Sequence, residues 1–491
     1  MKRYILGLDE GTTSARALVY DAVDNSIINI TNEKFKQYFP NPGWVEHDAN
    51  EIWEVMQRTL NKAIKDSGIK HEEIIGLGIT NQRESIVAWN KDTGESICPS
   101  IVWQCRRTKD YCDKIPSKMR RYIKENTGLI VDPYFSATKI KWILDNSSKA
   151  NQLLEKNKLC VGTIDSYITF RLTKGEKFIT DTSNASRTML FNIKTLKWDE
   201  KLLKYFNIPE NILPEVVSNG KPLGIAHTKY GDIAIGSILG DQQSSLFGQG
   251  CFSVGLAKAT YGTGCFILSN TGDNIAENPK MLSTIAWTIN NKTTYAQEGS
   301  IFNAGTVVNW LIDNVGILKS NKESSDICNS LSGTNGVYFV PAFTGMGAPY
   351  WNSTSTGSIV GLTRGTTKNE IIRAGLESIA YNTCDILTCM ENKKLSIKEL
   401  HVDGGVSRND FLMQFQADML GKKVVKPSST ECTALGTIFM AGLSLGHFKS
   451  LTEIKSKVQI SKVYKNTFST KQREDLLNGW HKAVKKTIGE K

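Results

Sequence analysis

Three short polar segments of this chain carry residue types that could act on an anionic or polyhydroxyl ligand. The first, residues 9–14, reads Asp-Glu-Gly-Thr-Thr-Ser and follows the apolar run 4–8. A glycine beside hydroxyl side chains lets backbone N–H and side-chain O–H groups converge on an anion. The Asp9 carboxylate could hold Mg²⁺, directly or through water. An ordinary β-hairpin whose turn needs glycine and threonine is the competing interpretation.

The second segment is Arg83-Glu84, which lies between the apolar runs 74–79 and 85–89. Arginine donates hydrogen bonds and an ionised glutamate accepts them, so the pair could bind both sides of a hydroxyl group. A surface ion pair in a loop is the structural alternative. Trp103, which ends another apolar run, could give a carbon chain a flat wall, although core packing explains most tryptophans.

The third segment, Gly240-Asp241-Gln242-Gln243, follows a predicted strand at 233–239. It would place a carboxylate at the carboxyl edge of a sheet, where open α/β sheets bind ligands. Asp241 could also be a helix N-cap with no further role. The glycine and the two glutamines around it favour a site.

The elements around these segments repeat. Predicted strands at 4–8 and 15–20 flank the first turn, and predicted strands at 256–261 and 265–269 flank the turn Gly262-Thr263-Gly264. Two such hairpins, about 250 residues apart, predict a duplicated architecture in which each half contributes one jaw around a nucleotide. A later strand, 400–402, leads into Asp403-Gly404-Gly405, where the backbone could pass close to a flat ligand.

Helix start and stop signals complete the outline. Capping-box patterns predict helices that begin after Asp48, Thr367 and Ser469, and glycines end two predicted helices at Gly68 and Gly421. A helix is also predicted over 137–144. The segment 180–190 is polar and is predicted to be a loop. No Pro/Ser-rich linker separates the two halves, so they should be closely apposed.

Composition limits the class of protein. At 491 residues, with 40% hydrophobic and 22% charged residues, the chain can form two or three globular domains. Ten cysteines without a CxxC pair indicate buried thiols in a reducing compartment. The first strand begins by residue 4, with no signal peptide or apolar run of membrane-spanning length, so we expect a cytoplasmic protein.

Motifs for several other functions are lacking. The net charge of +11 comes from scattered lysines, without an RNP-like motif, zinc-finger spacing or long basic tract, so nucleic-acid binding is only a secondary interpretation. The sequence contains no P-loop, HExxH or GxSxG motif, which argues against those nucleotide, metal and serine-hydrolase sites.

Together, the segments resemble the FGGY carbohydrate kinases of the actin/hexokinase/Hsp70-like superfamily, and most of all the members that phosphorylate glycerol. The resemblance covers nearly the whole chain. Besides residues 9–14, it includes the segments 42–47, 78–84, 101–107, 132–136, 184–191, 240–243, 261–266, 345–351 and 402–405.

This resemblance implies an α/β fold with two RNase H-like (actin-like ATPase) domains, at 1–250 and 251–491, flanking a nucleotide cleft. It implies transfer of the γ-phosphoryl group of ATP to glycerol, giving sn-glycerol 3-phosphate, with ATP and Mg²⁺ bound in the cleft. A homodimer or homotetramer is also implied. Nucleic acid and membrane insertion are not expected.

The resemblance also assigns roles to residues of this chain. Asp241 would be the catalytic base, Asp9 would hold Mg²⁺ through water, and Trp103 and Phe266 would wall the carbon side of glycerol. The glycerol hydroxyls would meet Arg83, Glu84, Tyr134, Asp241 and Gln242. Phosphate and nucleotide contacts would come from Thr12, Thr13, Ser14, Arg16, Thr263, Gly305, Asn309, Gly405 and Asn409.

Two departures from the commoner family pattern stand out. Glu10 occupies a position where many members have glutamine, which would change the charge beside the phosphates. The segment 223–233 is short and lacks the Gly-Gly-Thr-Arg loop that binds fructose 1,6-bisphosphate in some bacterial relatives. A sibling kinase for another polyol or ketopentose, and an actin- or Hsp70-like ATPase, are the alternative functions.

Overall fold

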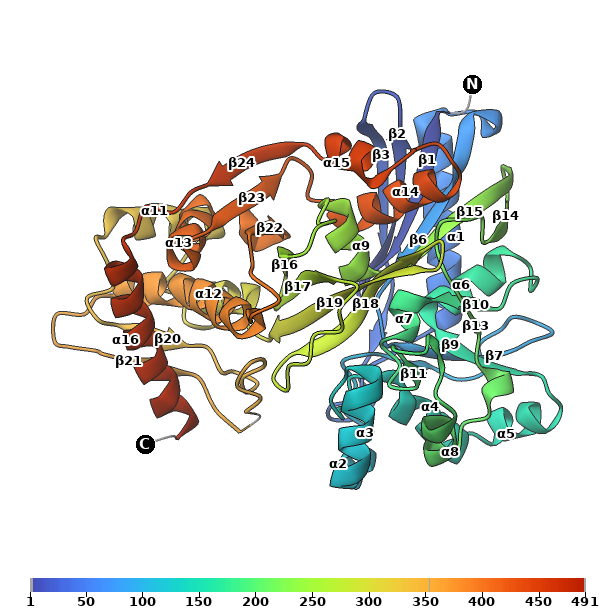
Figure 1. Cartoon of the computed structure of the whole chain (residues 1–491), viewed down its shortest axis with the longest axis horizontal. Helices are drawn as coiled ribbons and strands as arrows, with labels where there is room; N and C mark the ends of the chain where they lie inside the picture. Colours follow the sequence, from blue (N-terminus) through green and yellow to red (C-terminus); the bar gives the residue numbers. More distant parts are fainter. Residues whose placement is uncertain (1–2, 353, 490–491) are drawn as a thin grey trace.

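The computed structural model describes residues 3–352 and 354–489 and is built on two large sheets (Figure 1). The first sheet has the strand order β14 (Gly224–Thr228), β15 (Gly231–Gly240), β6 (Ile74–Asn81), β1 (Tyr4–Glu10), β2 (Ser14–Asp21) and β3 (Ser26–Lys34). The second has the order β18 (Leu282–Ile289), β19 (Lys292–Ile301), β17 (Cys265–Gly272), β16 (Leu256–Tyr261), β22 (Glu399–Asp403), β23 (Lys423–Pro427) and β24 (Ile460–Tyr464).

The two sheets repeat the same pairing pattern. In each, the first strand of a hairpin pairs antiparallel with the second (β1 with β2, β16 with β17) and parallel with a later strand (β6 and β22). A further parallel strand (β15 and β23) and an antiparallel edge strand (β14 and β24) follow in both sheets. The two predicted hairpins thus occupy equivalent positions, and the duplicated architecture is confirmed.

One face of the first sheet is covered by α1 (Ala49–Ser67) and α6 (Ile164–Leu172), which bury a shared apolar core against β1, β2 and β6. The Asp48 side chain caps α1 by accepting from the backbone N–H groups of Asn50 and Glu51. The predicted capping box is incomplete, because the Glu51 carboxylate accepts from the Lys36 backbone N–H instead. Gly68 ends α1 in a left-handed conformation, as predicted.

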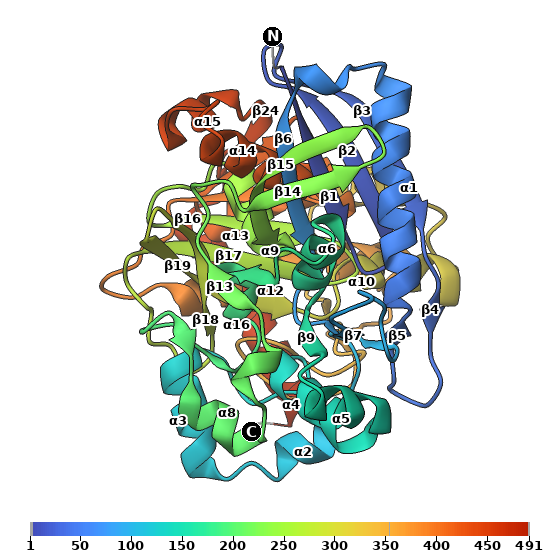
Figure 2. The ribbon, with the colours of Figure 1, turned by 90° about the vertical axis from the view of Figure 1, so that its right-hand side faces the viewer.

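The opposite face of the first sheet is covered by α14 (Cys432–Ser444), a helix from the second half of the chain (Figures 1 and 2). It approaches closely because the strands beneath it carry glycines. A Cβ atom at Gly78 would lie 2.5 Å from the backbone oxygen of Thr437, and one at Gly236 would lie 2.9 Å from the Ala441 backbone. The Thr437 hydroxyl donates to the Ile79 carbonyl at 3.0 Å.

A helix from the first half lies correspondingly against the second sheet. Helix α9 (Asp241–Gly248) packs Leu246 and Phe247 beside Leu268 and Trp287 of β17 and β18. The same apolar cluster continues through α14 to the first sheet. The two halves therefore share one core in which each receives a helix from the other.

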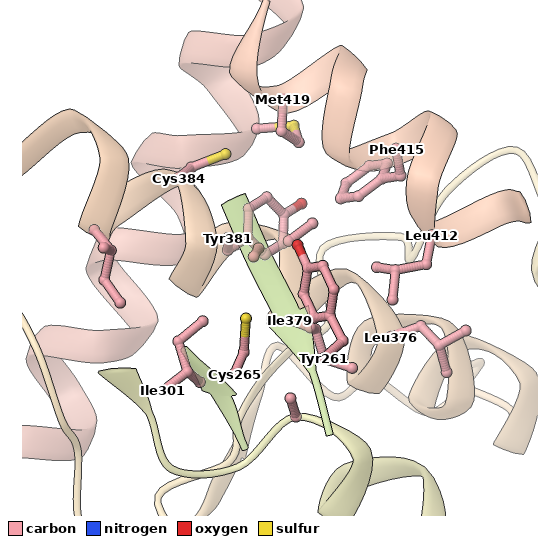
Figure 3. Packing of buried hydrophobic residues seen from close by; sticks show 14 of the residues in the cluster. Tyr261, Cys265, Ile301, Leu376, Ile379, Tyr381, Cys384, Leu412, Phe415 and Met419 are labelled. Atoms are coloured by element: carbon pink, nitrogen blue, oxygen red, sulfur yellow. The ribbon is translucent and has the colours of Figure 1, made fainter. Parts of the chain in front are cut away.

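The outer face of the second sheet is covered by α12 (Lys368–Met390) and α13 (Asp410–Leu420), and α16 (Thr470–Ile488) packs on α12, where Trp480 stacks on Tyr381. Figure 3 shows Tyr261 and Cys265, at the base of the second hairpin, among apolar side chains of this core. The predicted capping boxes at the starts of α12 and α16 are both present, and Gly421 ends α13.

A smaller lobe and several short elements complete the chain. The lobe contains η2 (Glu210–Ile212), α2 (Lys109–Asp113), α3 (Ser117–Thr127), α4 (Ser136–Asn146), α5 (Ser148–Glu155) and α8 (Glu200–Phe206) around a sheet of β4 (Gln37–Tyr38), β5 (Glu46–His47), β8 (Ser100–Ile101), β7 (Ile86–Asn90) and β9 (Leu159–Thr163). Elsewhere lie η1 (His71–Glu73), β11 (Phe191–Asn192), β12 (Lys197–Trp198), β13 (Glu215–Val217), α10 (Gly305–Asn309), η3 (Trp310–Asn314), α11 (Asn321–Ser330), β20 (Tyr338–Val340), β21 (Ser358–Val360), η4 (Gly405–Arg408) and α15 (Leu451–Lys457).

Four other sequence features can be compared with the structure. The segment 180–190 is no surface loop: it is buried throughout and contains most of β10 (Ile179–Asp181) and all of α7 (Thr182–Ala185). All ten cysteines are free thiols. In the described parts of the chain, no helix is both long and apolar enough to span a bilayer. Strands β14 and β15 are joined by only two residues, so the segment 223–233 is a tight hairpin.

Candidate active site

The register of the first sheet brings the three polar segments to one edge. Glu10 at the end of β1 pairs with Asn81 at the end of β6, which in turn pairs with Gly240 at the end of β15. These three strands are parallel, so their carboxyl ends lie side by side. Arg83 and Asp241, which follow β6 and β15, therefore lie next to each other, with Arg83 Nε 3.2 Å from Asp241 Oδ1.

A buried cluster of four charges lies beneath this edge. Arg83 forms a two-pronged ion pair with Glu298 of β19, with Nη1 2.6 Å from Oε2 and Nη2 3.2 Å from Oε1. Arg187 joins the two glutamates, since its Nη2 donates to Glu298 at 2.8 Å and its Nε donates to Glu84 at 2.6 Å. All four side chains are almost completely buried. The surface-pair alternative for Arg83 and Glu84 is therefore wrong.

Glu298 is the anion that balances both arginines. Burial by itself would raise the pKa of its carboxyl, but Arg187 and Arg83 outweigh burial and hold the pKa at about 2. Sequence reasoning missed both Glu298 and Arg187. The only signals were a glutamate inside the otherwise uncharged strand segment 293–301 and an arginine inside the segment 180–190.

The backbone at Glu84 adopts a left-handed conformation, with φ of 63°. A residue with a Cβ atom rarely adopts this geometry, which costs roughly 1–2 kcal/mol. Two contacts hold it there: the Ser136 hydroxyl donates to the Glu84 carbonyl at 3.1 Å, and Arg187 fixes the carboxylate. Such local strain typically occurs at functional sites.

Asp241 is the first residue of α9 and keeps an accessible carboxylate, with 28% of its side chain exposed. Gly240, rather than Asp241, is the N-cap of that helix. Gln242 holds both carboxylate oxygens, with its backbone N–H donating at 2.7 Å and its side-chain amide at 3.0 Å. The fully buried Lys258 ammonium in turn donates to the Gln242 side-chain oxygen and to Thr260. The carboxylate is thus fixed in direction while one side stays open.

Three aromatic rings form a wall near these groups. Trp103 packs edge-on against Tyr134, with ring centroids 5.6 Å apart, and against Phe266 of β17, with centroids 6.0 Å apart. The Tyr134 hydroxyl accepts from Arg83 at 3.3 Å. The Trp103 indole N–H donates to the Thr12 hydroxyl at 3.0 Å, so the wall also contacts the first hairpin.

In each of the two hairpin turns, the first glycine donates a backbone hydrogen bond that closes the turn. The Gly11 N–H donates to the Ser14 carbonyl at 3.0 Å, and the Gly262 N–H donates to the Gly264 carbonyl at 2.8 Å. Thr13 and Thr263 are exposed at the two tips, whereas Ser14 is buried. Arg16 of β2 pairs with Glu431, which precedes α14, at 2.9 Å. That ion pair joins the two halves of the chain.

The predicted nucleotide residues differ in their availability. Gly405, at the start of η4, is exposed and has open space where a Cβ would lie, and Asn309 is exposed at the end of α10. Gly305 is buried, and its N–H donates to the Gly262 carbonyl at 3.0 Å. Asn409 caps α13 by accepting from the Leu412 N–H, and its amide donates to Ser324. The side chain of Asn409 is therefore already engaged.

A cavity of about 400 Å³ adjoins this region at the carboxyl ends of β22 and β23. None of the predicted nucleotide residues lines it. Its walls are Val402, Asp403, Ser407, Arg408, Asp410, Lys426, Pro427, Ser428, Ser429, Thr430, Ser461 and Lys462.

Asp9 and Glu10 lie side by side on β1 but in different surroundings. Burial raises the pKa of Asp9 to about 7, although Arg16 opposes the shift. Glu10 is fully buried, accepts from the Gln82 side chain at 2.7 Å, and has a pKa well above its usual range because of burial. Within residues 3–352 and 354–489, no group of three or more His, Cys, Asp and Glu side chains is arranged to hold a metal ion.

Comparisons with known proteins agree with this architecture. Residues 4–248 match the N-terminal domain of the FGGY family of carbohydrate kinases, and residues 257–445 match the C-terminal domain. A glycerol kinase from Desulforamulus reducens is 47% identical over 493 residues, covering 99% of this chain and 98% of the relative.

Two solved structures have the same fold. The crystal structure of Plasmodium falciparum glycerol kinase with ADP has a TM-score of 0.92 and 35% identity, covering 99% of this chain and 98% of that chain. A xylulose kinase from Lactobacillus acidophilus, with a TM-score of 0.89, 24% identity and the same coverage, is alike in fold. The expected α/β fold with two actin-like domains is confirmed, and the chain belongs to the FGGY family of carbohydrate kinases.

Proposed function

We propose that this chain is a glycerol kinase, which transfers the γ-phosphoryl group of ATP to glycerol and releases sn-glycerol 3-phosphate and ADP. The observation that carries the proposal is the Asp241 carboxylate, which is accessible, held in place by Gln242 and next to Arg83. It lies at the carboxyl edge of the first sheet, where the β1–β2 hairpin also turns. Support also comes from the glycerol kinase of Desulforamulus reducens, which is 47% identical along nearly its whole length.

Glycerol would lie between the charged edge and the aromatic wall. Its hydroxyl groups would bind Arg83, Glu84, Tyr134, Asp241 and Gln242, which supply both donors and acceptors. Its carbon side would pack on Trp103 and Phe266. We take the aromatic wall beside Arg83 and Glu84 to favour a small acceptor over a ketopentose.

The phosphates of ATP would lie between the two hairpins. Thr12, Thr13, Ser14 and Arg16 would bind them from the first sheet, and Thr263 from the second. The nucleoside would lie near Gly305, Asn309 and Gly405, with the Asn409 backbone close by. Such a reaction asks the protein mainly to position the reactants and to stabilise the charge that spreads over the transferred group.

Asp9 is the residue that we propose for Mg²⁺. Burial raises the pKa of its carboxyl more than Arg16 lowers it, so a further cation beside this group would be favourable. A single carboxylate fits Mg²⁺, which keeps several waters and takes its remaining ligands from phosphate oxygens. When bound, Mg²⁺ would offset negative charge on the β- and γ-phosphates.

Asp241 would accept the proton that glycerol loses in the reaction. As the terminal hydroxyl oxygen of glycerol bonds to the γ-phosphorus, the bond from that phosphorus to the β,γ-bridging oxygen breaks and ADP leaves. The hydroxyl proton passes to the Asp241 carboxylate, and such general-base catalysis is typically worth about 10²–10⁴-fold in rate. Closure of the two halves around the substrates would exclude water and limit wasteful hydrolysis of ATP.

Coupled ADP release over a panel of glycerol, other polyols and ketopentoses tests the proposal. We expect glycerol to give the highest kcat/KM. A higher value with a ketopentose such as xylulose would support the sibling-kinase alternative. ATP hydrolysis that is independent of any acceptor would support the actin- or Hsp70-like ATPase alternative. A cytoplasmic location, a dimeric or tetrameric state and a domain boundary at residue 250 stay predictions.

A further inference from the structure

The donors of Arg83 are almost fully used within the protein. Nη1 donates to Glu298 and, at 3.3 Å, to Gln243, while Nη2 donates to Glu298 and, at 3.3 Å, to Tyr134. An arginine side chain has five N–H groups. These four contacts leave the Nε–H, which is on the side of Asp241, 3.2 Å from Oδ1.

Glu298 determines which N–H groups of the Arg83 guanidinium remain available to Asp241. It comes from β19 of the second half, whereas Arg83 and Arg187 come from the first half. Because the Glu298 carboxylate occupies both Nη atoms of Arg83, the guanidinium cannot turn those atoms toward Asp241 without breaking the pair. A two-pronged arginine–carboxylate pair is the strongest geometry available to either side chain.

We propose that Glu298 is a positioning residue for phosphoryl transfer: as the counter-ion of Arg83, it keeps this arginine from pairing two-pronged with Asp241, so that the Asp241 carboxylate stays free for the acceptor hydroxyl. This inference rests on the proposed function. Glu298 itself touches no reacting atom; it acts through Arg83.

The charge balance of the buried cluster explains why position 298 needs a negatively charged side chain. Without the negative charge of Glu298, two buried guanidinium groups would share only Glu84. A buried cation that loses its partner seeks another, and Asp241 is the accessible carboxylate already next to Arg83. Once paired through both of its oxygens, Asp241 could no longer accept the hydroxyl proton of glycerol.

The experiment compares Glu298→Gln with Glu377→Gln. Glu377 is a matched control, because it is also a buried glutamate paired with an arginine (Arg373, 2.7 Å) but lies on α12 in the second-half core. We expect Glu298→Gln to lower kcat at least tenfold and raise the KM for glycerol, while the KM for ATP stays within twofold. Glu377→Gln should leave all three constants unchanged at a temperature where both variants are folded.

A crystal structure of Glu298→Gln gives a second readout that does not depend on activity. We expect both Nη atoms, or one Nη atom and Nε, of Arg83 to contact the Asp241 carboxylate. An unmoved Arg83, or wild-type kcat and KM for glycerol, would overturn the inference. If the wild-type protein phosphorylates no polyol, the proposed function fails, whereas the position of Arg83 still decides this inference.

Glu298→Asp serves if the glutamine variant does not fold. It keeps the charge on a shorter side chain that cannot reach both Nη atoms at once. We expect an intermediate loss of kcat and an intermediate rise in the KM for glycerol. Wild-type constants in Glu298→Asp would overturn the inference, because they would show that the two-pronged contact is dispensable.

Discussion

Asp241 differs from the other carboxylates of the site in what holds it. Glu84 and Glu298 are buried and paired with arginines, whereas Asp241 accepts from the uncharged Gln242 at both oxygens, contacts Arg83 through the Nε atom alone at 3.2 Å, and stays 28% exposed. A carboxylate that is oriented but keeps an open side can still accept a proton from a substrate hydroxyl. This difference, more than proximity to any hairpin, makes Asp241 the candidate base.

Replacement of Asp241 by asparagine tests that role. The amide oxygen can still accept from Gln242 and from a glycerol hydroxyl, so we expect the dissociation constant for glycerol to change less than about tenfold. Without the base, kcat should fall by about 10²–10⁴-fold. Coupled ADP release measures kcat, and calorimetric titration measures glycerol binding. A kcat near that of the wild type would remove Asp241 from the base role.

Asp9 should make the ligand-free protein less stable as the pH rises. Its folded pKa of about 7 lies above the value near 4 expected in the unfolded chain. Between these values the folded state holds the proton more tightly, so stability falls from about pH 4 to about pH 7 and then levels off. Asp9→Asn lacks this penalty, which is on the order of 4 kcal/mol.

Thermal unfolding without nucleotide, at pH 4.5, 6 and 8, measures the effect. The Tm of Asp9→Asn should exceed that of the wild type by a margin that grows with pH. A margin of the same size at all three values would contradict the shifted pKa of Asp9. Phosphorylation of glycerol should be strongly reduced in this variant, because the proposed Mg²⁺ ligand is lost.

At the scale of elements, the close packing of α14 on the first sheet depends on glycines in β1, β6 and β15. A Cβ at Gly78 would lie 2.5 Å from a backbone oxygen and 2.6 Å from the hydroxyl of Thr437, so the helix itself would have to move. The carboxyl ends of β6 and β15 carry Arg83 and Asp241. A shift of α14 would therefore disturb the sheet that positions both residues.

Gly78→Ala is expected to destabilise the protein by about 1–3 kcal/mol, the usual cost of overpacking a tight interior. Gly333→Ala is the control, because a Cβ there meets no atom within 4 Å. Thermal or urea unfolding of the two variants gives the comparison. Equal stabilities would mean that α14 moves away from β6 at little cost.

Local patterns predicted most of these elements and several of the site residues. Alternating apolar runs and turn glycines predicted both hairpins, and capping residues predicted the starts of α12 and α16, because these signals act within a few residues. Glu298 and Arg187 could not be found in this way. Their partners lie 215 and 103 residues away, and only the tertiary fold brings β19 and the segment after α7 next to Arg83 and Glu84.

The same limit applies to two other features. Asn409 stays a predicted nucleotide residue, and no local pattern indicates that its side-chain amide donates to Ser324, a contact across 85 residues. The segment 180–190 looked like a loop because it is polar, yet its side chains are buried and bond to one another and to β18. Polarity predicts exposure only where no partner is available inside.

At the scale of the whole molecule, the two halves exchange helices. The face of the first sheet that carries Ile5, Leu18 and Tyr20 is covered by α14, whereas α9 leaves the first half to cover the second sheet. The shared core means that the folded state of each half depends on residues of the other. When the two halves close, they must therefore rotate about the contact between α9 and α14, which stays intact.

A fragment of residues 1–250 should not fold alone. It lacks α14, so a large apolar face of its main sheet would be open to water and prone to association. We expect the fragment to be insoluble or to lack a cooperative thermal transition, and to gain solubility when produced together with residues 251–491. The full chain should unfold in a single transition. A soluble, cooperatively unfolding 1–250 fragment would contradict the shared core.

The late position of α14 in the sequence affects how the protein is made. Synthesis proceeds at about 5–20 residues per second, so roughly 10–40 s separate the emergence of the last strand of the first sheet from that of the helix that covers it. During that interval the nascent chain presents an uncovered apolar surface to the cell. We therefore expect this protein to depend on chaperones that bind growing chains, and its yield of native enzyme to respond to changes in translation speed over the codons of its second half.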